Sequence, residues 1–368
     1  MNFLCEKDKL LEGISTVIKA VVSKTPMPIL QGILISTDED CIILTTNNLE
    51  TGIECIIPAI VRENGSIVIG DARVFFEIIR KLPNDYISVE VDDNYHTTIK
   101  CQKSVYNIIG LNPIEFPELP IIKEKASFEI NAEVLKQMIR QTLFAVSTRP
   151  EKPTLTGSLF EIDGDNLSII SLDGFRMAIR KEKIDASGNE KFIISGKTLG
   201  DIVKIIKDED LPIKIKLTDK YVMFEYEKTK VISRLIEGDY YDYKRIIPTD
   251  FRVKTVLNLQ DILVCVERTD PIVAVDILKN PIKITIDNNS LSIDCITSTG
   301  KVHDIIDIDD CGEKIEIGFN QRYLHEALQA CECEEIFMEF NGSLNPCIIK
   351  PLEGDSFLFM VLPVKLSN

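Results

Sequence analysis

Apolar residues recur every three or four positions in the first block of this sequence and every second position in the blocks that follow it. Residues 7–22 place their apolar side chains on one helical face, which predicts an amphipathic helix. Alternation then predicts three strands, at 32–37, 41–46 and 52–58. A second helix is predicted at 72–82, where Asp71 can cap the first turn. Three more strands are predicted after it, at 86–91, 97–101 and 105–109.

This plan of a helix followed by strands occurs again about 125 residues later, and then a third time. Gly32 and Gly157 are 125 residues apart, and Gly300 lies 126 residues beyond Gly174. Further helices are predicted at 131–145, after the strand that begins at Phe192, at 259–267 and at 321–330. A repeat of this length in 368 residues predicts three domains, 1–125, 126–250 and 251–368. Each domain would contain two copies of a helix followed by antiparallel strands, so the expected fold class is α+β.

The composition is that of an ordinary globular protein. Apolar residues make up 45% of the chain, but no apolar run approaches the roughly 20 residues of a membrane helix. The first residues lack the basic and apolar regions of a signal peptide, so we expect a cytoplasmic protein. Ten cysteines are scattered without a CxxC pair, and the three histidines stand far apart. We therefore expect reduced, mostly packed thiols, no metal site and no cofactor.

The distribution of charge changes the picture that the total charge gives. A net charge of -16 argues at first sight against a nucleic-acid partner. Binding depends, however, on where charge is placed. Lysine and arginine recur on the polar faces of most of the six predicted helices, whereas acidic residues gather in turns such as 38–40 and 92–93. One such helix would be interpreted as a solvated face, but repetition over equivalent helices favours a shared basic surface.

No motif in the sequence predicts an enzyme. Gly196-Lys197-Thr198 is similar to the end of a phosphate-binding loop, but that loop needs a Gly five residues before Gly196, where this chain has Lys191. GxSxG, HExxH and GxGxxG are absent from the sequence. The pair Asp173-Gly174 predicts a turn between strands. We predict no catalytic residues.

Five motifs extend over most of the chain in a fixed order. They are Leu155-Thr-Gly157, Asp173-Gly-Phe-Arg-Met177, Tyr243-Lys-Arg-Ile-Ile-Pro248, Ile317-Gly-Phe-Asn320 with Tyr323, and Phe359-Met-Val-Leu-Pro-Val-Lys-Leu366. Together with the repeat they resemble the bacterial DNA polymerase III beta subunit, the sliding clamp. The resemblance implies three clamp domains per chain and a head-to-tail homodimer that closes a six-domain ring around duplex DNA. Such a ring would bind DNA without reading its sequence and would tether the replicative polymerase as a processivity factor.

The resemblance also implies three kinds of site. The DNA-facing candidates are Lys24, Arg73, Lys136, Arg140, Arg149, Lys197 and Lys204. Ring closure would pair an edge strand near 105–109, with Tyr106 and Ile108 as contacts, with an edge near 301–307 of a second chain. A pocket would receive a short peptide, containing Gln and a Leu-Phe-like pair, from polymerases, the clamp loader and repair factors. Its wall would consist of Leu155, Leu172, Gly174, Phe175, Arg176, Met177, Tyr241, Arg245, Ile246, Asn320, Tyr323, Leu344, Pro346, Met360, Val361, Leu362, Pro363, Val364, Lys365 and Leu366.

The end of the chain gives a physical reason for this pocket. Residues 357–366 are too apolar for a free tail, so they should pack and leave an aliphatic groove with Arg at its rim. Leu172, Phe175 and Tyr241 stand where the family commonly has a small hydroxyl residue, His and Pro. The peptide preference should differ accordingly. The third unit is shorter around 268–275, and we expect no pocket residue there.

Two other functions are compatible with the same residues. The chain could be a repeat scaffold that binds peptides without DNA, which retention on circular but not linear DNA would exclude. It could also be an enzyme whose site is assembled across domains, although no nucleophile and base are found at a suitable spacing.

Overall fold

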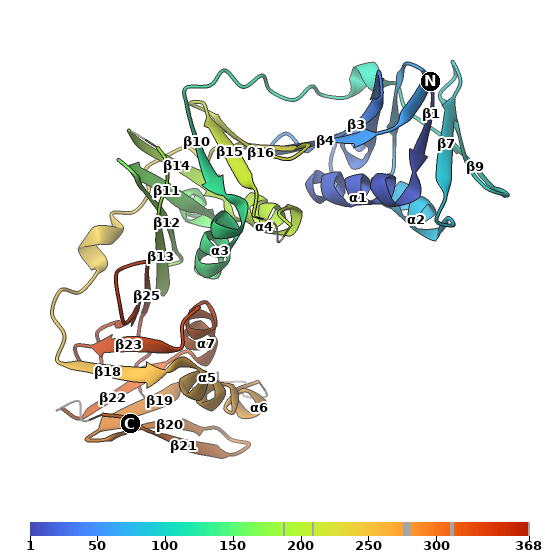
Figure 1. Cartoon of the computed structure of the whole chain (residues 1–368). Coiled ribbons are helices and arrows are strands. Elements are labelled where there is room, and N and C mark those ends of the chain that lie inside the picture. The colour runs from blue at the N-terminus through green and yellow to red at the C-terminus, as the bar shows by residue number, and fades with distance from the viewer. Residues whose placement is uncertain (187, 208–209, 275–280, 310–312, 367–368) are drawn as a thin grey trace. The chain divides into compact units, whose positions relative to one another are not determined.

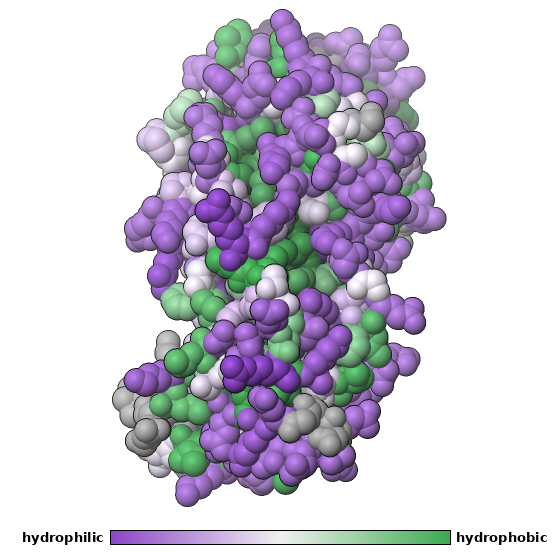
Figure 2. Space-filling model, turned by 90° about the vertical axis from the view of Figure 1, so that its left-hand side faces the viewer, coloured by the Kyte–Doolittle hydropathy of each residue, from purple (hydrophilic) through white to green (hydrophobic). Residues whose placement is uncertain are grey.

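The computed structural model describes residues 1–186, 188–207, 210–274, 281–309 and 313–366. The chain forms two compact units, one of Met1–Glu133 with Asp201–Leu235 (unit 1) and one of Val134–Gly200 with Ile236–Asn368 (unit 2). Within the described ranges no helix is long and apolar enough to cross a membrane. Hydrophilic side chains dominate the face in Figure 2, with hydrophobic ones gathered in separate areas.

Unit 1 contains two antiparallel sheets and the helices α1 (Lys7–Val17) and α2 (Ala72–Lys81), as Figure 1 shows. The first sheet has the order β5-β1-β7-β8-β9, with strands β1 (Asn2–Glu6), β5 (Ile60–Glu63), β7 (Tyr86–Val91), β8 (His96–Cys101) and β9 (Ser104–Ile109). The second has the order β10-β15-β16-β17-β4-β3-β2-β6, with strands β2 (Ile33–Asp38), β3 (Cys41–Asn47), β4 (Thr51–Pro58), β6 (Ser66–Ile69), β10 (Ala126–Asn131), β15 (Pro212–Leu217), β16 (Tyr221–Tyr226) and β17 (Thr229–Arg234).

Unit 2 has the same kind of architecture, with α5 (Leu259–Glu267), the short α6 (Asp270–Val273) and α7 (Gln321–Gln329). One sheet has the order β14-β11-β12-β13-β25-β24-β23-β18, with strands β11 (Gly157–Asp163), β12 (Asn166–Leu172), β13 (Arg176–Lys183), β14 (Asn189–Ser195), β18 (Val253–Asn258), β23 (Glu335–Phe340), β24 (Cys347–Pro351) and β25 (Phe357–Val361). The other has the order β21-β20-β19-β22, with strands β19 (Ile282–Asp287), β20 (Ser290–Ile296), β21 (Lys301–Asp307) and β22 (Ile315–Phe319). The boundaries between the two units fall within the helices α3 (Ala132–Leu143) and α4 (Gly196–Ile205).

The predicted α+β class is confirmed, and so are the six helices predicted from periodicity. Each buries one apolar face: Leu10, Ile14 and Val17 of α1 are buried, and so are Ile262, Cys265 and Val266 of α5. Asp71 caps α2 as expected, because its carboxylate accepts hydrogen bonds from the backbone N–H groups of Arg73 and Val74.

Some predicted boundaries are wrong, and several short elements were not predicted. The helix predicted at 7–22 ends at Val17, because Ile18–Ala20 form a 3-10 turn and Val21 is extended, as suits a β-branched residue. The helix predicted at 131–145 covers only Ala132–Leu143. The strands β1, β10 and β18 were not predicted, because each runs directly into the first helix of its repeat without a turn between them. The strand β5 was missed because it has only four residues and is mostly exposed. The short α6 lies where we expected a shortened loop, and residue 275 of that expectation is outside the described residues.

Both eight-stranded sheets combine strands from two successive repeats. In unit 1, β17 pairs with β4, with Thr229 opposite Cys55 and Ser233 opposite Thr51. In unit 2, β13 pairs with β25 from Arg176 opposite Val361 to Arg180 opposite Phe357. A sequence repeat therefore does not coincide with one sheet, because each repeat contributes its strands to two sheets.

Candidate functional site

An apolar cluster in unit 2 brings together five of the predicted pocket residues. Leu155, Leu172, Met177 and Met360 are all buried in it, and Ile246 packs against it. These residues come from a 3-10 turn before β11, the end of β12, the start of β13, strand β25 and the 3-10 turn Tyr243–Ile246. Three strands and two 3-10 turns thus contribute to one buried apolar cluster.

Beside this cluster, two predicted pocket residues form an aromatic pair. The rings of Phe175 and Tyr323 lie 5.9 Å apart between centroids at an angle of 29°. Phe175 remains 40% exposed, and the guanidinium carbon of Arg149 lies 5.3 Å from its ring centroid. Arg149, one of the predicted DNA-facing residues, therefore contacts a residue of the predicted peptide pocket. This cation–π contact places a positive charge beside the aromatic pair.

Arg176 is the polar centre of the same region. It is 7% exposed, its Nε lies 3.1 Å from Asp173 Oδ2, and its Nη1 donates to Glu326 Oε2. The guanidinium carbon also lies 4.5 Å from the ring centroid of Tyr323 and 5.4 Å from that of Phe144. A buried guanidinium needs such anionic partners, because an unpaired buried charge costs several kcal/mol. Phe144 and Glu326 were not predicted; the signal that could have indicated Glu326 is the need of Arg176 for a second carboxylate.

The turn before Arg176 has the conformation that its sequence predicts. Gly174 has φ +93°, which favours glycine, and Asp173 Oδ1 accepts hydrogen bonds from the backbone N–H groups of Phe175 (2.8 Å) and Arg176 (3.1 Å). The turn therefore presents Phe175 outward while Arg176 points into the protein.

The last residues of the described chain, Leu362–Leu366, form a tail that crosses between two sheets of unit 2. The N–H of Leu362 donates to the carbonyl of Phe175 (2.8 Å), and the N–H of Val364 donates to the carbonyl of Gly318 on β22 (2.8 Å). A Cβ on Gly318 would lie 2.6 Å from the Val364 carbonyl oxygen and 2.8 Å from Leu366 Cδ2. The tail is therefore packed, as its apolar composition predicts, and glycine is needed at 318 for its close approach.

The chain segment 236–251, which we call the connector, forms the other side of this region. Tyr241 is 55% exposed, and the side chain of Arg245 is 86% exposed and paired with Asp242 (Nε to Oδ2, 2.7 Å). The hydroxyl of Tyr240 donates to the carbonyl of Ile170 at 3.3 Å. Burial raises the pKa of that phenol, so Tyr240 stays neutral and anchors the connector.

The remaining predicted pocket residues lie in loops of unit 2. Asn320 caps α7 by accepting a hydrogen bond from the N–H of Tyr323 (3.4 Å). Leu344 is 75% exposed and Pro346 is partly buried, both in the turn before β24. Val361 is buried at the end of β25, whereas Pro363 is partly buried and Lys365 is exposed. The predicted pocket residues thus combine a buried aliphatic cluster with the rings of Phe175 and Tyr323 and with exposed cations.

The predicted DNA-facing residues differ in their exposure. In unit 1, Arg73 of α2 donates through Nη2 to Ser23 Oγ (3.2 Å), next to the exposed Lys24. Lys204 of α4 is exposed, with its Nζ 3.5 Å from Asp201 Oδ1. In unit 2, Arg140 and Lys197 are exposed on α3 and α4. These side chains are available to phosphates.

Lys136 departs from the prediction. It is only 5% exposed, so its ammonium group does not lie on a solvent-facing surface. In α3 it follows the buried Leu135 and stands one turn from the buried Ala132 and Ile139, which places its stem at the edge of the apolar face. A basic residue in a helical sequence is therefore not by itself evidence of a basic surface.

Both predicted interface strands are sheet edges. Strand β9 ends one sheet of unit 1, and Val105, Tyr106 and Ile109 on it are 54%, 37% and 73% exposed. Strand β21 ends a sheet of unit 2, and its Ile305 is 55% exposed. Exposed apolar edge strands invite pairing with another chain.

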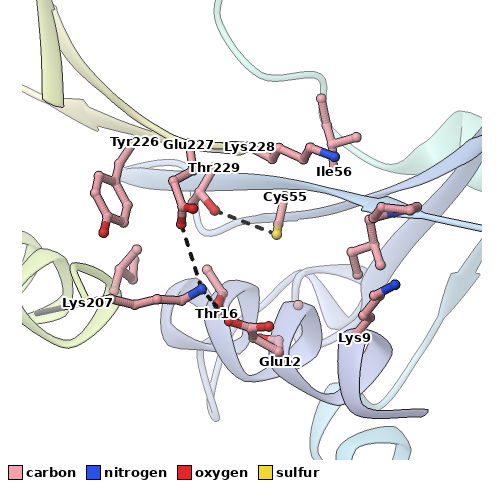
Figure 3. Close-up of a pocket in the computed structure, with 14 residues that line it drawn as sticks. Lys9, Glu12, Thr16, Cys55, Ile56, Lys207, Tyr226, Glu227, Lys228 and Thr229 are labelled. Carbon is pink, nitrogen blue, oxygen red and sulfur yellow. Dashed lines mark hydrogen bonds and ion pairs between the residues drawn. The ribbon is translucent and has the colours of Figure 1, made fainter. Parts of the chain in front are cut away.

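A pocket of about 390 Å³ lies elsewhere, in unit 1, between α1, β4 and the turn that joins β16 to β17 (Figure 3). The ammonium group of Lys207 lies 2.7 Å from Glu12 and 3.7 Å from Glu227, so it links α1 to that turn. The hydroxyl of Thr229 donates to the sulfur of Cys55 at 3.6 Å. Burial raises the pKa of the Cys55 thiol, which argues against a reactive thiolate in this pocket.

Most of the described cysteines are buried free thiols like Cys55. Nine described cysteines, Cys55 included, carry free thiols, and seven of these are buried; Cys311 lies outside the described residues. Burial raises the pKa of Cys5 and of Cys265 to about 11. Across the described ranges no three His, Cys, Asp or Glu residues are grouped as metal ligands.

The architecture of paired helices with antiparallel sheets that successive repeats share is that of the class of DNA clamps. Three family models, describing the N-terminal, central and C-terminal domains of the DNA polymerase III beta subunit, match residues 1–120, 129–242 and 244–365. The beta sliding clamp of Bacillus subtilis is 33% identical over 99% of this chain and 100% of the relative, and that of Staphylococcus epidermidis is 33% identical over 99% of both chains. The crystal structure of the Bacillus subtilis DNA polymerase sliding clamp superimposes with a TM-score of 0.96 at 32% identity over 100% of both chains. The chain belongs to the DNA polymerase III beta subunit family.

Proposed function

We propose that this chain is the sliding clamp that serves as processivity factor of the replicative DNA polymerase. It acts without catalysis, in the cytoplasm: two copies close head to tail around duplex DNA and tether polymerase, clamp loader and repair factors through short peptides. The three domains are 1–125, 126–250 and 251–368. The observation that carries the proposal is the pattern of sheet junctions, in which two junctions form within the chain and the strands for a third, β9 and β21, each lie at a sheet edge.

The repeat explains why those edges should pair. The third strand after the second helix of one repeat pairs with the third strand after the first helix of the repeat before it: β17 pairs with β4, and β25 pairs with β13. The equivalent strand in the first repeat is β9, and the equivalent third strand in the last repeat is β21. Both are free edges. A second chain supplies the missing partner, and two such identical junctions close a head-to-tail dimer.

The repeat also gives the register of this third junction. Strand β9 precedes β17 by 125 residues, and β21 follows β4 by 250 residues. Applying the β17–β4 register, in which Ile232 lies opposite Gly52, places Asn107 opposite Val302 of the partner chain. Tyr106 then lies opposite His303 and Ile108 opposite Lys301, so both predicted contact residues fall inside the ladder.

Cysteine pairs test this register in solution. Directly opposite antiparallel residues have Cα atoms about 4.5–5.5 Å apart, within the range of a disulfide. We expect the double variant Asn107→Cys/Val302→Cys to form intermolecular disulfides on mild oxidation, giving twice 41.5 kDa on non-reducing gels. The matched control Val105→Cys/Val302→Cys is displaced by two residues and should cross-link poorly. Equal cross-linking of both pairs, or of neither, would refute the register.

Retention on DNA tests the proposed activity. The exposed cations Lys24, Arg73, Arg140, Arg149, Lys197 and Lys204 would contact phosphates without base readout. We expect the protein, once loaded, to stay on nicked circular DNA and to slide off after linearisation. Equal binding to both forms, or binding to neither, would favour the peptide scaffold without a DNA function.

The peptide site is the second part of the proposal. The aliphatic floor and the rim of Phe175, Tyr323, Arg149 and Arg245 would hold an extended peptide with a Leu-Phe-like pair. Because the tail forms part of the wall, deleting residues 364–368 should abolish polymerase stimulation while the protein still loads on DNA. Intact stimulation after the deletion would show that the site is elsewhere.

A further inference from the structure

A buried carboxylate on the sheet of unit 2 holds the connector in place. Glu161 of β11 is 8% exposed and has three donors: Lys191 Nζ at 2.9 Å, the Tyr243 hydroxyl at 2.6 Å and Lys244 Nζ at 3.2 Å. Lys191 is the residue opposite Glu161 on the neighbouring strand β14. The other two donors belong to the 3-10 turn Tyr243–Ile246 of the connector. Three donors satisfy a carboxylate that would otherwise be costly to bury.

The charge on Glu161 is secure at neutral pH. Burial alone raises the pKa of its carboxyl, but the hydrogen bonds from Lys191, Tyr243 and Lys244 outweigh burial and lower the pKa to about 2. Burial and the neighbouring Glu161 carboxylate raise the pKa of Tyr243. The phenol therefore remains a hydrogen-bond donor to an ionised carboxylate across the physiological range.

The same turn carries residues of the candidate peptide site. The side chain of Tyr243 is buried in the apolar cluster with Leu155, Leu172 and Met360, while its hydroxyl reaches Glu161. Two residues further on, Arg245 is exposed at the rim, and Ile246 packs against the cluster. The position of this wall is thus determined by a contact that lies outside the peptide site.

We propose that Glu161 is a positioning residue for peptide binding: it sets the place of the turn Tyr243–Ile246, and so of Arg245 and Ile246, without touching the peptide. The inference rests on the proposed function of the site. Sites in which neighbouring residues hold the contact residues in place lose affinity when those supports are removed, because free protein must then adopt the binding geometry at a cost.

The chain offers a matched control for general loss of stability. Glu339 of β23 is 5% exposed and is also paired with two lysines, Lys350 at 2.8 Å and Lys254 at 3.5 Å. Those partners lie on strands β24 and β18, on either side of β23 in the same sheet. Glu339 therefore supports strands directly, and it reaches the connector only through Lys350, whose Nζ lies 5.1 Å from the ring centroid of Phe251 at the far end from Tyr243.

The test compares Glu161→Gln with Glu339→Gln in the full-length protein. Binding of a fluorescein-labelled decapeptide that contains Gln and a Leu-Phe pair is measured by anisotropy, together with the melting temperature and with hydrogen exchange of residues 240–247. We expect both variants to melt earlier. Only Glu161→Gln should bind the peptide about tenfold more weakly, equivalent to about 1.4 kcal/mol, and exchange faster at 240–247.

Each other outcome is informative. Unchanged affinity in Glu161→Gln, or equal losses in both variants, overturns the positioning role. If Glu161→Gln does not fold, Tyr243→Phe removes only the hydroxyl and should still weaken binding several-fold, with the cluster intact. Unweakened binding by Tyr243→Phe would likewise count against the proposal. If the unaltered protein does not bind the peptide, the peptide site itself is wrongly assigned and the inference fails with it.

Discussion

The contact between the tail and Gly318 gives the sharpest single-residue prediction. In Gly318→Ala the new methyl group would meet the Val364 carbonyl oxygen at 2.6 Å and Leu366 Cδ2 at 2.8 Å, so the tail must move by several tenths of an ångström. Overpacking of this kind costs about 1–3 kcal/mol. The first repeat makes the equivalent backbone bridge, Val68 with Leu111, although Val68 carries a side chain. We therefore expect the tail to shift rather than to detach, with a cost near the lower limit.

Peptide binding should report this shift more strongly than folding does. We expect Gly318→Ala to melt within a few degrees of the unaltered protein but to bind the labelled decapeptide about fivefold more weakly, equivalent to about 1 kcal/mol. The matched control is Gly200→Ala in α4, where the new methyl group would meet only Leu143 Cδ2, at an ordinary 3.6 Å. Because Ala is favoured over Gly within a helix by about 0.5–1 kcal/mol, the control should be slightly stabilised and bind normally. Unchanged affinity in Gly318→Ala would refute the view that the tail forms the wall.

Three further predictions concern charge and the free edge. The low pKa of Glu161, about 2 in the folded protein, means that its ion pairs stabilise the fold fully above the unfolded value near 4.3 and are lost as pH falls towards 2. We expect the free energy of unfolding to fall by about 3 kcal/mol in that window. The melting temperature of Glu161→Gln should therefore fall less between pH 5 and 3 than that of the unaltered protein, and an equal fall in both proteins would contradict this. Tyr106→Lys on β9 should shift light-scattering mass towards the monomer while the control Tyr86→Lys on β7 stays dimeric, and a dimeric Tyr106→Lys would count against the β9 interface. Lys207→Met removes partly exposed ion pairs to Glu12 and Glu227 (Figure 3), so the free energy of unfolding should decrease by less than about 1 kcal/mol. A decrease above about 2 kcal/mol would show that this link contributes more than exposed ion pairs usually do.

The helices and the antiparallel strands were predictable because their signals are local. Periodicity over about ten residues indicates α2 and α5, and the cap at Asp71 involves only the four consecutive residues 71–74. The pairing of β17 with β4 and of β13 with β25 was not predicted, because the residue pattern of a strand does not determine its partner when several edge strands have similar patterns. The strand β1 was missed because it runs directly into α1, with Glu6 followed by Lys7, so no turn marks its end.

The candidate site was predictable only through the resemblance. Motif positions indicated Phe175, Tyr323 and the tail, and the structure brings these together. Residue type alone could not distinguish the buried Lys136 from the exposed Arg140, which stands four residues later in the same helix. Nor could it reveal Glu161, whose partners Tyr243 and Lys244 lie more than eighty residues away in sequence. Such long-range polar contacts depend on the assembled fold.

The backbone contact that holds the tail Leu362–Leu366 has a counterpart in each of the other two repeats. In each repeat a residue two or three positions after the last strand forms a backbone hydrogen bond with the strand before the second helix: Leu111 with Val68, Ile236 with Ile193, and Val364 with Gly318. In the first two repeats the chain continues from this point into a connection to the next repeat, so the following residues are committed to another strand. In the third repeat the same bridge holds Val364 of the tail, close to the hydrogen bond between Leu362 and Phe175. A Cβ at Gly318 would lie 2.6 Å from the Val364 carbonyl oxygen, whereas Val68 and Ile193 carry side chains at the same place in their repeats. Because we propose that the tail forms part of the peptide-binding wall, we expect substitution at Gly318 to affect binding more than folding.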